Sequence, residues 1–280
     1  MAEKSARILL VCKRFFLTKM RPYLAANAIT IANSGFNTLM RYGIFSDIHA
    51  NLEALNAALE VYKKERIERY LCIGDIISYG ADPSQCIRIV RELKANIVAG
   101  NHEWGVCAKS KLENFTDTAQ EALVWTKAAL REEERDFLDS LPLAYEEENF
   151  ILVHGSLDSP ANFYYLNNME EADRSFAVLK KQVCFVGHTH RPGVFVERDK
   201  ELFFKPLKVL ELEDNKRYIV NVGSIGQPRD RDCRASLVVY DSDTKTIELK
   251  RVDYDFRRTQ EKILKAGLPE PLAWRLAEGR

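Results

Sequence analysis

The sequence predicts an α/β fold in its first half and an α+β arrangement in its second half. From residue 40 to about residue 100, short apolar runs alternate with amphipathic segments, which is the pattern of strands connected by helices. After residue 150 the apolar runs follow one another more closely, as expected for short, mostly antiparallel strands. Short motifs of Asp, Asn, His and Gly follow five of the apolar runs.

The first half contains a predicted βαβαβ unit. A strand is expected at residues 42–46, and a helix at residues 51–64 places its apolar residues on one face. A strand at residues 70–73, a helix at residues 83–93 that begins with proline, and a strand at residues 96–99 complete the unit. Ligands of open α/β sheets bind outside the carboxyl ends of the strands, which is where the motifs fall.

The rest of the chain begins with a predicted helical region at residues 116–141, which has a capping box at Thr118 and Glu121 and ends at Pro142. Six strands are then expected, at residues 150–153, 183–186, 194–196, 218–222, 236–240 and 246–252. Residues 241–244 form the predicted hairpin turn between the last two strands. A helical segment with regularly spaced leucines follows, and we expect it to pack on the outside.

Residues 1–39 differ in composition from everything after them. They contain six basic residues and one acidic residue, and asparagines make their uncharged part too polar for a membrane span. Because Met40 directly precedes the first predicted strand, we expect the folded domain to span residues 40–280. Residues 1–39 are then an N-terminal extension that is non-essential or disordered. A targeting peptide and a structured N-terminal element are the alternatives.

The composition predicts a globular, cytoplasmic protein with no broad surface for nucleic acid. The 280 residues are 46% hydrophobic, which is enough for a large core. Of 41 basic and 41 acidic residues, 35 and 40 lie after residue 39, so the main body lacks a positive field. The six cysteines form no CxxC pair, which argues against disulfides or a zinc finger and favours a reducing compartment.

Residue types that bind metals are concentrated in the motifs after the strands. All five histidines lie in such motifs, which read Asp47-Ile-His49, Gly74-Asp75, Gly100-Asn101-His102-Glu103, Val153-His154-Gly155 and Gly187-His188-Thr189-His190. Imidazole and carboxylate are common ligands of transition metals, so this set suits a two-metal hydrolytic site. Residue type and spacing do not decide which of the histidines bind metal.

Local spacing adds some detail. Along an extended strand end, Asp47 and His49 would point to the same side and reach one metal ion. The two oxygens of Asp75 are suited to bridging two cations. Gly74 and Gly80 would allow the Asp75 loop to pass close to the site, because neither has a side chain.

The order of the motifs resembles that of the calcineurin-like metallophosphoesterase superfamily. The blocks Asp-x-His, Gly-Asp-x4-Gly, Gly-Asn-His-Glu, His-Gly and Gly-His-Thr-His occur in the family's order between Arg41 and His190. Further on, Asn221-Val-Gly-Ser224 resembles the Asn-Pro-Gly-Ser segment of the prokaryotic phosphodiesterase branch. The resemblance implies a four-layer αββα sandwich, in which two mixed β-sheets are flanked by helices.

The resemblance also implies a role for each motif residue. Seven residues would hold two divalent metal ions: Asp47, His49 and His190 the first, Asn101, His154 and His188 the second, and Asp75 both. A hydroxide shared by the metals would attack phosphorus in line, and His102 would protonate the leaving group as a general acid. The metals would be Mn, Fe, Zn, Ni or Co, among which the sequence does not distinguish.

Two departures from the protein Ser/Thr phosphatase branch bear on the substrate. In that branch the second block is similar to Gly-Asp-x-Val-Asp-Arg-Gly. Here Ser78 and Tyr79 stand in place of its second Asp and its Arg. Ser78 cannot supply a charge to orient His102, and Tyr79 cannot clamp phosphate with two N–H groups. Ala99 also stands where the third block has an arginine. These differences favour a phosphodiesterase or a small phosphorylated substrate.

Arg191, Arg229 and Tyr79 are the candidate substrate-binding residues. Arg191 directly follows the last motif histidine, and Arg229 follows the Gly223-Ser224 segment, so either arginine could point into the cleft. Arg231 and Arg234 are further candidates. A solvated surface position is the alternative for each arginine.

The predicted function is hydrolysis of a phosphodiester or phosphomonoester in a small-molecule or nucleotide-like substrate. A Ser/Thr protein phosphatase or nucleotide phosphatase at the same site is the first alternative, which arginines clustered around the metals would favour. A non-catalytic scaffold with the same fold is the second alternative. A broken ligand set would favour the scaffold, whereas Asp75 and His102 are both present. No membrane partner is expected.

Overall fold

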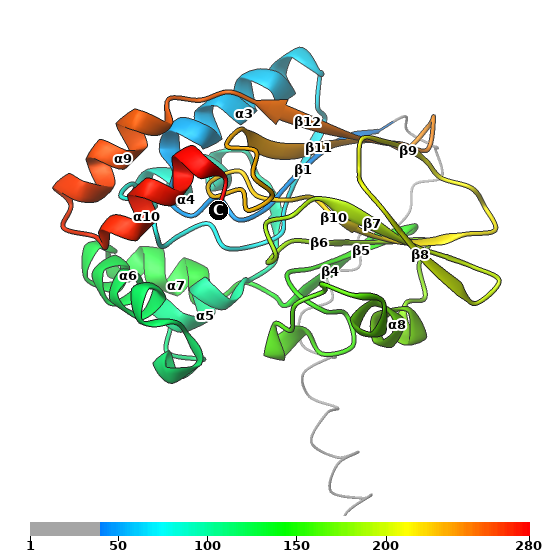
Figure 1. Cartoon of the computed structure of the whole chain (residues 1–280), viewed down its shortest axis with the longest axis horizontal. Helices are drawn as coiled ribbons and strands as arrows, with labels where there is room; N and C mark the ends of the chain where they lie inside the picture. The colour runs from blue at the N-terminus through cyan, green and yellow to red at the C-terminus, as the bar shows by residue number, and fades with distance from the viewer. Residues whose placement is uncertain (1–39) are drawn as a thin grey trace, which may run out of the picture. The chain divides into compact units, whose positions relative to one another are not determined.

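Two six-stranded β-sheets packed face to face form the centre of the protein in the computed structural model, which describes residues 40–280 (Figure 1). Helices cover the outer face of each sheet. The α/β class and the four-layer sandwich that the resemblance implied are therefore confirmed. The extension expected at residues 1–39 lies outside the described residues.

The first sheet combines strands from both ends of the domain. Its order is β3 (Asn96–Ile97), β2 (Arg69–Cys72), β1 (Arg41–Phe45), β11 (Ala235–Asp241), β12 (Thr246–Val252) and β9 (Val209–Glu211). β1 pairs in parallel with β2 and antiparallel with β11, so that Gly43 lies between Tyr70 and Val239. The chain returns to the first sheet with β9, adds β10 to the second sheet, and then completes the first sheet with β11 and β12, which the order of the elements alone does not reveal.

The second sheet comes from the middle of the chain. Its order is β4 (Ala144–Glu146), β5 (Phe150–Val153), β6 (Val183–Val186), β10 (Arg217–Asn221), β7 (Gly193–Arg198) and β8 (Glu201–Lys205). β5, β6 and β10 are parallel to one another, whereas β4, β7 and β8 run antiparallel to their neighbours. Five of the six parallel strands are followed by one of the motifs, and β10 is followed by the Asn221–Ser224 segment.

Alternation along the strands divides the apolar side chains between two core layers. Ile44 and Leu71 of the first sheet pack with Leu152 and Phe185 of the second, and all four are fully buried. Phe45, the neighbour of Ile44, instead packs against the helices outside the first sheet. Burial on both faces explains why these strands appear in the sequence as continuous apolar runs.

The outer helices have amphipathic sequences. Those that pack on the first sheet are α3 (Leu52–Lys64), α4 (Pro83–Glu92), α5 (Asn101–Val106), α6 (Asp117–Ala129) and α7 (Glu132–Asp139). Only α8 (Met169–Val178) packs on the second sheet among the described helices. Asn51 begins α3, because its Oδ1 accepts a hydrogen bond from the N–H of Ala54 at 3.1 Å. None of the helices in residues 40–280 has the length and apolar content needed to cross a membrane.

The C-terminal segment packs on the outside, as the sequence predicted. It consists of α9 (Phe256–Lys265), α10 (Glu270–Trp274) and a 3₁₀ turn (Arg275–Glu278). Leu272 and Leu276 are buried against Ala119 and Ala122 of α6, and Tyr79 belongs to the same apolar cluster. Tyr79 thus joins the C-terminal segment to the loop that follows Asp75.

Most of the predicted elements are present, and the differences have local causes. The helical region at 116–141 is two helices, and α6 begins after Thr116, so the capping box expected at Thr118 and Glu121 is wrong. β4, β8, β9, α5 and α8 were not predicted. β4 and β9 have only three residues each. In β8 the neighbouring Phe203 and Phe204 are both exposed, so this strand lacks the alternation of apolar and polar residues that predicts a strand. The predicted turn at 241–244 is confirmed, because Asp241 Oδ1 accepts hydrogen bonds from two backbone N–H groups of that turn.

Replacing Tyr62 by Phe tests how α3 is attached to the first sheet. The buried Tyr62 hydroxyl lies 2.8 Å from the carbonyl of Ile44 in β1 and 3.2 Å from that of Val238 in β11. We expect Tyr62→Phe to lower the free energy of unfolding in urea by about 1–2 kcal/mol. Tyr70→Phe is the control, because the Tyr70 hydroxyl makes no hydrogen bond within residues 40–280. Equal effects of the two substitutions would contradict this account.

Candidate metal centre

Loops from both sheets bring the motif residues together at one end of the sandwich. Asp47 and His49 follow β1, Asp75 follows β2, and His154 follows β5. Asn101 and His102 begin α5, which three residues separate from the end of β3, and His188 and His190 lie in the loop between β6 and β7. The carboxyl ends of neighbouring parallel strands meet at one edge, so residues more than 100 positions apart become neighbours.

The backbone of these loops is not an extension of the strands. Asp47, His49, Asp75, His188 and His190 all have left-handed backbone conformations, with φ between 48° and 65°. The expectation that strand alternation aligns Asp47 with His49 is therefore wrong. Each such residue costs about 1–2 kcal/mol, so the surrounding contacts hold the chain in a strained shape that turns these side chains inward.

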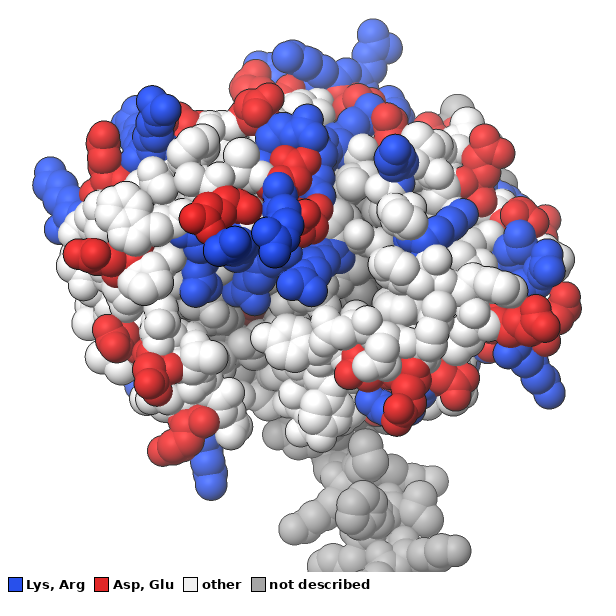
Figure 2. Space-filling view, viewed as in Figure 1, with Lys and Arg blue, Asp and Glu red and all other residues white. Residues whose placement is uncertain are grey.

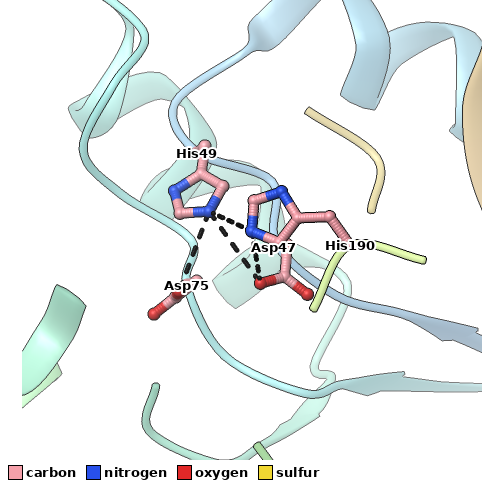
Figure 3. A group of neighbouring side chains, drawn as sticks. All are labelled: Asp47, His49, Asp75 and His190. Carbon is pink, nitrogen blue, oxygen red and sulfur yellow. Dashed lines mark hydrogen bonds and ion pairs between the residues drawn. The ribbon is translucent and has the colours of Figure 1, made fainter. Parts of the chain in front are cut away.

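One group of side chains consists of Asp47, His49, Asp75 and His190, all of them buried (Figure 3). Nε2 of His49 lies 3.1 Å from Nε2 of His190 and 3.7 Å from Oδ2 of Asp75. Nε2 of His190 lies 3.2 Å from Oδ1 of Asp47. The potential ligand atoms of this group therefore point toward one another, as Figure 3 shows.

A second group consists of Asp75, His154 and His188. Nε2 of His154 lies 3.2 Å from Oδ2 of Asp75 and 3.1 Å from Nδ1 of His188. Oδ1 of Asn101 lies 3.2 Å from the same nitrogen of His154. Asp75 belongs to both groups, which is the position that a bridging carboxylate requires.

Backbone carbonyls orient three of the imidazoles from behind. Nδ1 of His49 contacts the carbonyl of Ile77 at 3.2 Å, Nδ1 of His154 that of Ile73 at 2.6 Å, and Nδ1 of His190 that of Gln227 at 2.5 Å. A carbonyl only accepts hydrogen bonds, so each Nδ1 carries a proton, and the Nε2 of each neutral imidazole presents a lone pair to the centre.

Donor chemistry at the centre fits divalent cations. Lone pairs of His49 and His190 face each other, and Oδ1 of Asp47 is buried without a hydrogen-bond donor among the described residues. An unpaired buried oxygen of this kind is costly, and a cation would satisfy it together with the imidazole nitrogens. The residues present therefore fit a metal centre.

The protonation states point in the same direction. Burial, together with the charges on neighbouring histidines, lowers the pKa of His49 and of His188 well below the usual value, so both imidazoles are neutral ligands at pH 7. Burial would also lower the pKa of His154, but the carboxylates of Asp75 and Asp47 outweigh it and raise that pKa to about 10. Without a cation, a proton neutralises the carboxylates, and metal binding would displace it.

Glu103 holds the Asp75 loop in place. Its carboxylate accepts hydrogen bonds of 2.8 Å from the N–H groups of Asp75, Ile76 and Gly100. Burial and the nearby charge of Asp75 raise the pKa of Glu103 to about 7. Gly74, with φ of 85°, is needed at the start of this loop, since a Cβ there would lie 2.5 Å from the nitrogen of Gly100.

The Asn221–Ser224 segment fastens the loops of the two sheets together. Nδ2 of Asn221 donates to the carbonyl of Gly187 at 2.7 Å, and the Ser224 hydroxyl donates to the carbonyl of Asp47 at 2.8 Å. In the sequence, only its resemblance to Asn-Pro-Gly-Ser marks this segment. Its hydrogen bonds show that it positions the two loops that carry Asp47 and His188.

His102 lies beside the two groups rather than within them. Its ring packs edge-on against His49 at 4.9 Å and Tyr79 at 4.6 Å, and its Nε2 lies 4.0 Å from Oδ2 of Asp75. Its Nδ1 is buried without a hydrogen-bond partner in residues 40–280. Burial lowers the pKa of His102 to about 4, although the charge of Asp75 opposes this shift. The Ser78 hydroxyl is likewise buried and unpaired within residues 40–280.

The candidate substrate-binding residues occupy different places. Tyr79 lines the centre, with its ring 4.4 Å from that of His49, and the Arg229 guanidinium lies 6.0 Å from the Tyr79 ring. Arg191 is exposed and donates to the carbonyl of Arg229, while Arg234 pairs with Asp232. Their roles in substrate binding stay predictions.

Two residues beside the centre, Gln227 and Arg275, belong to no motif in the sequence. Gln227 accepts a hydrogen bond from His190 through its carbonyl, and its side-chain oxygen contacts both Arg229 and Arg275. Arg275 lies 85 positions after His190 and outside every motif. No local signal marks it, because only the folding of the C-terminal segment brings it here.

Carboxylates and imidazoles that converge between two mixed sheets define a centre for metal-dependent hydrolysis. Comparison with known families agrees with this assignment. The family model for the calcineurin-like phosphoesterase superfamily domain matches residues 40–245, and the chain belongs to this superfamily. The predicted class, a hydrolase that acts on phosphoester bonds, is thereby confirmed.

Several relatives share most of the folded part. An uncharacterized protein from Methanocaldococcus jannaschii is 40% identical over 241 residues, which cover 85% of this chain and 97% of that protein. A phosphodiesterase of the same organism is 28% identical over 60% of this chain and 82% of its own length. The crystal structure of a metallophosphoesterase from Sphaerobacter thermophilus is 36% identical and has a TM-score of 0.76; the match covers 86% of this chain and 100% of that one.

Replacing Glu103 by Gln tests the support of Asp75. An amide would present N–H donors to backbone N–H groups that now meet a carboxylate oxygen. We expect Glu103→Gln to weaken metal binding by roughly 10- to 100-fold, as measured by competition with a chelator. The exposed Glu121→Gln is the control. Unchanged metal affinity in Glu103→Gln would mean that the loop is held by other contacts.

Proposed function

We propose that this protein hydrolyses a phosphodiester or phosphomonoester at two divalent metal ions. Asp47, His49 and His190 would hold one ion, Asn101, His154 and His188 the other, and Asp75 both. The position of Asp75 carries this proposal, because its Oδ2 lies 3.7 Å from His49 in the first group and 3.2 Å from His154 in the second. A carboxylate that belongs to both groups favours one site for two metal ions over two independent metal sites.

When bound, two divalent cations supply positive charge that activates water and stabilises the charge developing on phosphate oxygens. The ions would be Mn, Fe, Zn, Ni or Co, since imidazole and carboxylate ligands suit all of them. The chain itself contributes orientation. The carbonyls behind His49, His154 and His190 fix the imidazoles, and Glu103 fixes Asp75.

His102 would donate a proton to the leaving group, for which the negative charge of a bound phosphate must first raise its low pKa. It belongs to neither ligand group, it is next to Asp75 and His49, and its Nδ1 has no partner within residues 40–280. Tyr79 and Phe115 pack around its ring and limit its movement. A positioned acid of this kind contributes roughly 10²- to 10⁴-fold to the rate.

One experiment decides between hydrolysis and a scaffold. The protein is stripped of metal and reloaded with single metals, and its rates on an aryl phosphodiester and an aryl phosphomonoester are compared. Turnover that depends on metal supports the proposal. Metal binding without turnover of either ester would favour the non-catalytic scaffold.

Replacing Asp75 by Asn tests the bridging role. The substitution removes the negative charge shared by both groups while it keeps the size of the side chain. We expect Asp75→Asn to lower the metal content of the purified protein at both positions and to abolish hydrolysis, because each ion loses an anionic ligand. The exposed Asp173→Asn serves as the control. Full metal occupancy in Asp75→Asn would contradict the bridge.

Replacing His102 by Ala tests the general acid. We expect metal content to be unchanged and kcat to fall by roughly 10²- to 10⁴-fold for an ester with a poor leaving group. The decrease should be smaller for a 4-nitrophenyl ester, because a good leaving group departs without a proton. Loss of a metal ion in His102→Ala, or the same decrease for both esters, would show that His102 has a different role.

A further inference from the structure

The C-terminal segment places an arginine, Arg275, beside the metal centre. Arg275 begins the 3₁₀ turn after α10, and its Nη1 lies 3.3 Å from Oε1 of Gln227. Nη2 of Arg229 lies 2.9 Å from the same oxygen. Two guanidinium groups thus meet at one neutral amide oxygen. The backbone carbonyl of that glutamine accepts the hydrogen bond of His190, a proposed metal ligand.

Neither arginine has an acidic partner. In residues 40–280 no carboxylate lies within ion-pair distance of Arg229 or Arg275. Other partly buried arginines of the domain do have one: Arg217 pairs with Glu197, and Arg251 with Asp230. Both guanidiniums are half-buried, and burial together with the charge of Arg229 lowers the pKa of Arg275. Two adjacent positive charges without a counter-charge favour an anion between them.

The position of the pair beside the centre is fixed. Arg229 lies against Tyr79, whose ring contacts both His49 and His102. Leu272 and Leu276 flank Arg275 and are buried in the cluster that contains Tyr79. The N–H of Arg231 donates to the carbonyl of Gly279 at 2.9 Å, which fastens the end of the chain to the Arg229 loop.

The surface shows the same concentration of charge. Figure 2 shows Lys and Arg side chains gathered near the C-terminal end of the chain, above a hollow of this face. The C-terminal segment from Phe256 onward lies beyond residue 245, where the match to the family model ends. Arg275 therefore lies outside the part of the chain that the family model matches.

We propose that Arg229 and Arg275 together bind the phosphate of the substrate at the edge of the metal centre and favour a phosphate that carries two negative charges. The proposal rests on the proposed function. A phosphomonoester has a second negative charge near pH 7, since its second pKa is about 6, whereas a phosphodiester has one. Two guanidinium groups can donate hydrogen bonds to the additional unesterified oxygen of the monoester and neutralise its additional negative charge. The preferred substrate class is then a terminal phosphate, as in a phosphorylated small molecule or a nucleotide.

Arg275→Gln in the metal-loaded, full-length protein tests the pair. We expect kcat/KM for 4-nitrophenyl phosphate to fall on the order of 10- to 100-fold, which is typical of losing a charge-assisted contact. The value for bis(4-nitrophenyl) phosphate should change by less than about 3-fold, and metal content should stay the same. Arg275→Lys, which keeps the charge without the fork, should be intermediate. Arg280→Gln is the control, because Arg280 is exposed and pairs with Glu278.

Binding of inorganic phosphate gives a readout that does not depend on turnover. We expect phosphate to bind the metal-loaded wild type by calorimetry and to bind Arg275→Gln at least 10-fold more weakly. Equal phosphate affinity in the two proteins, or equal losses for monoester and diester, would overturn the proposal. If the wild type hydrolyses neither ester, the proposed function fails, while the phosphate titration still decides whether the arginine pair binds an anion.

Discussion

Electrostatic repulsion between inward-pointing lone pairs is the constraint on which the rest of this structure depends. Nε2 atoms of His49 and His190 lie 3.1 Å apart, and Nε2 of His190 lies 3.2 Å from Oδ1 of Asp47. Carbonyls behind these two imidazoles fix the tautomer that presents the lone pairs. Such a centre is stable only with positive charge inside it, and without a cation a proton at His154 supplies part of that charge. Metal binding and the conformation of the loops therefore depend on each other.

Holding these groups together requires backbone strain, which the sandwich compensates. Five of the metal-ligating candidates have left-handed φ values, and contacts from elsewhere hold their loops. Glu103 accepts hydrogen bonds from the backbone N–H groups of Asp75 and Gly100, and Asn221 and Ser224 fasten the loops of one sheet to those of the other. The two sheets share an apolar core, so neither edge can move without the other. This rigidity is what a preorganised catalytic centre needs.

Much of the fold was predictable from the sequence, because buried parallel strands are continuous apolar runs and their helices are amphipathic. The strands before Asp47, Asp75, His154 and His188 were all found in this way. Short or exposed strands such as β9 and β8 were missed, since they bury too little to leave a pattern. The ligand candidates were found by residue type and order, but the reason given for aligning Asp47 with His49 was wrong. The loop is left-handed there, and long-range hydrogen bonds set its shape.

The sequence by itself determined the class of the fold, the residues available to bind metal and the resemblance to a family of phosphoesterases. These follow from local patterns, in which composition and spacing directly reflect burial and chemistry. Tertiary structure alone decided which atoms face each other, that Asp75 is common to both groups, and that Arg275 reaches the centre from the end of the chain. A contact between residues far apart in the chain leaves no periodic signal, because it depends on how the two sheets and the C-terminal segment pack.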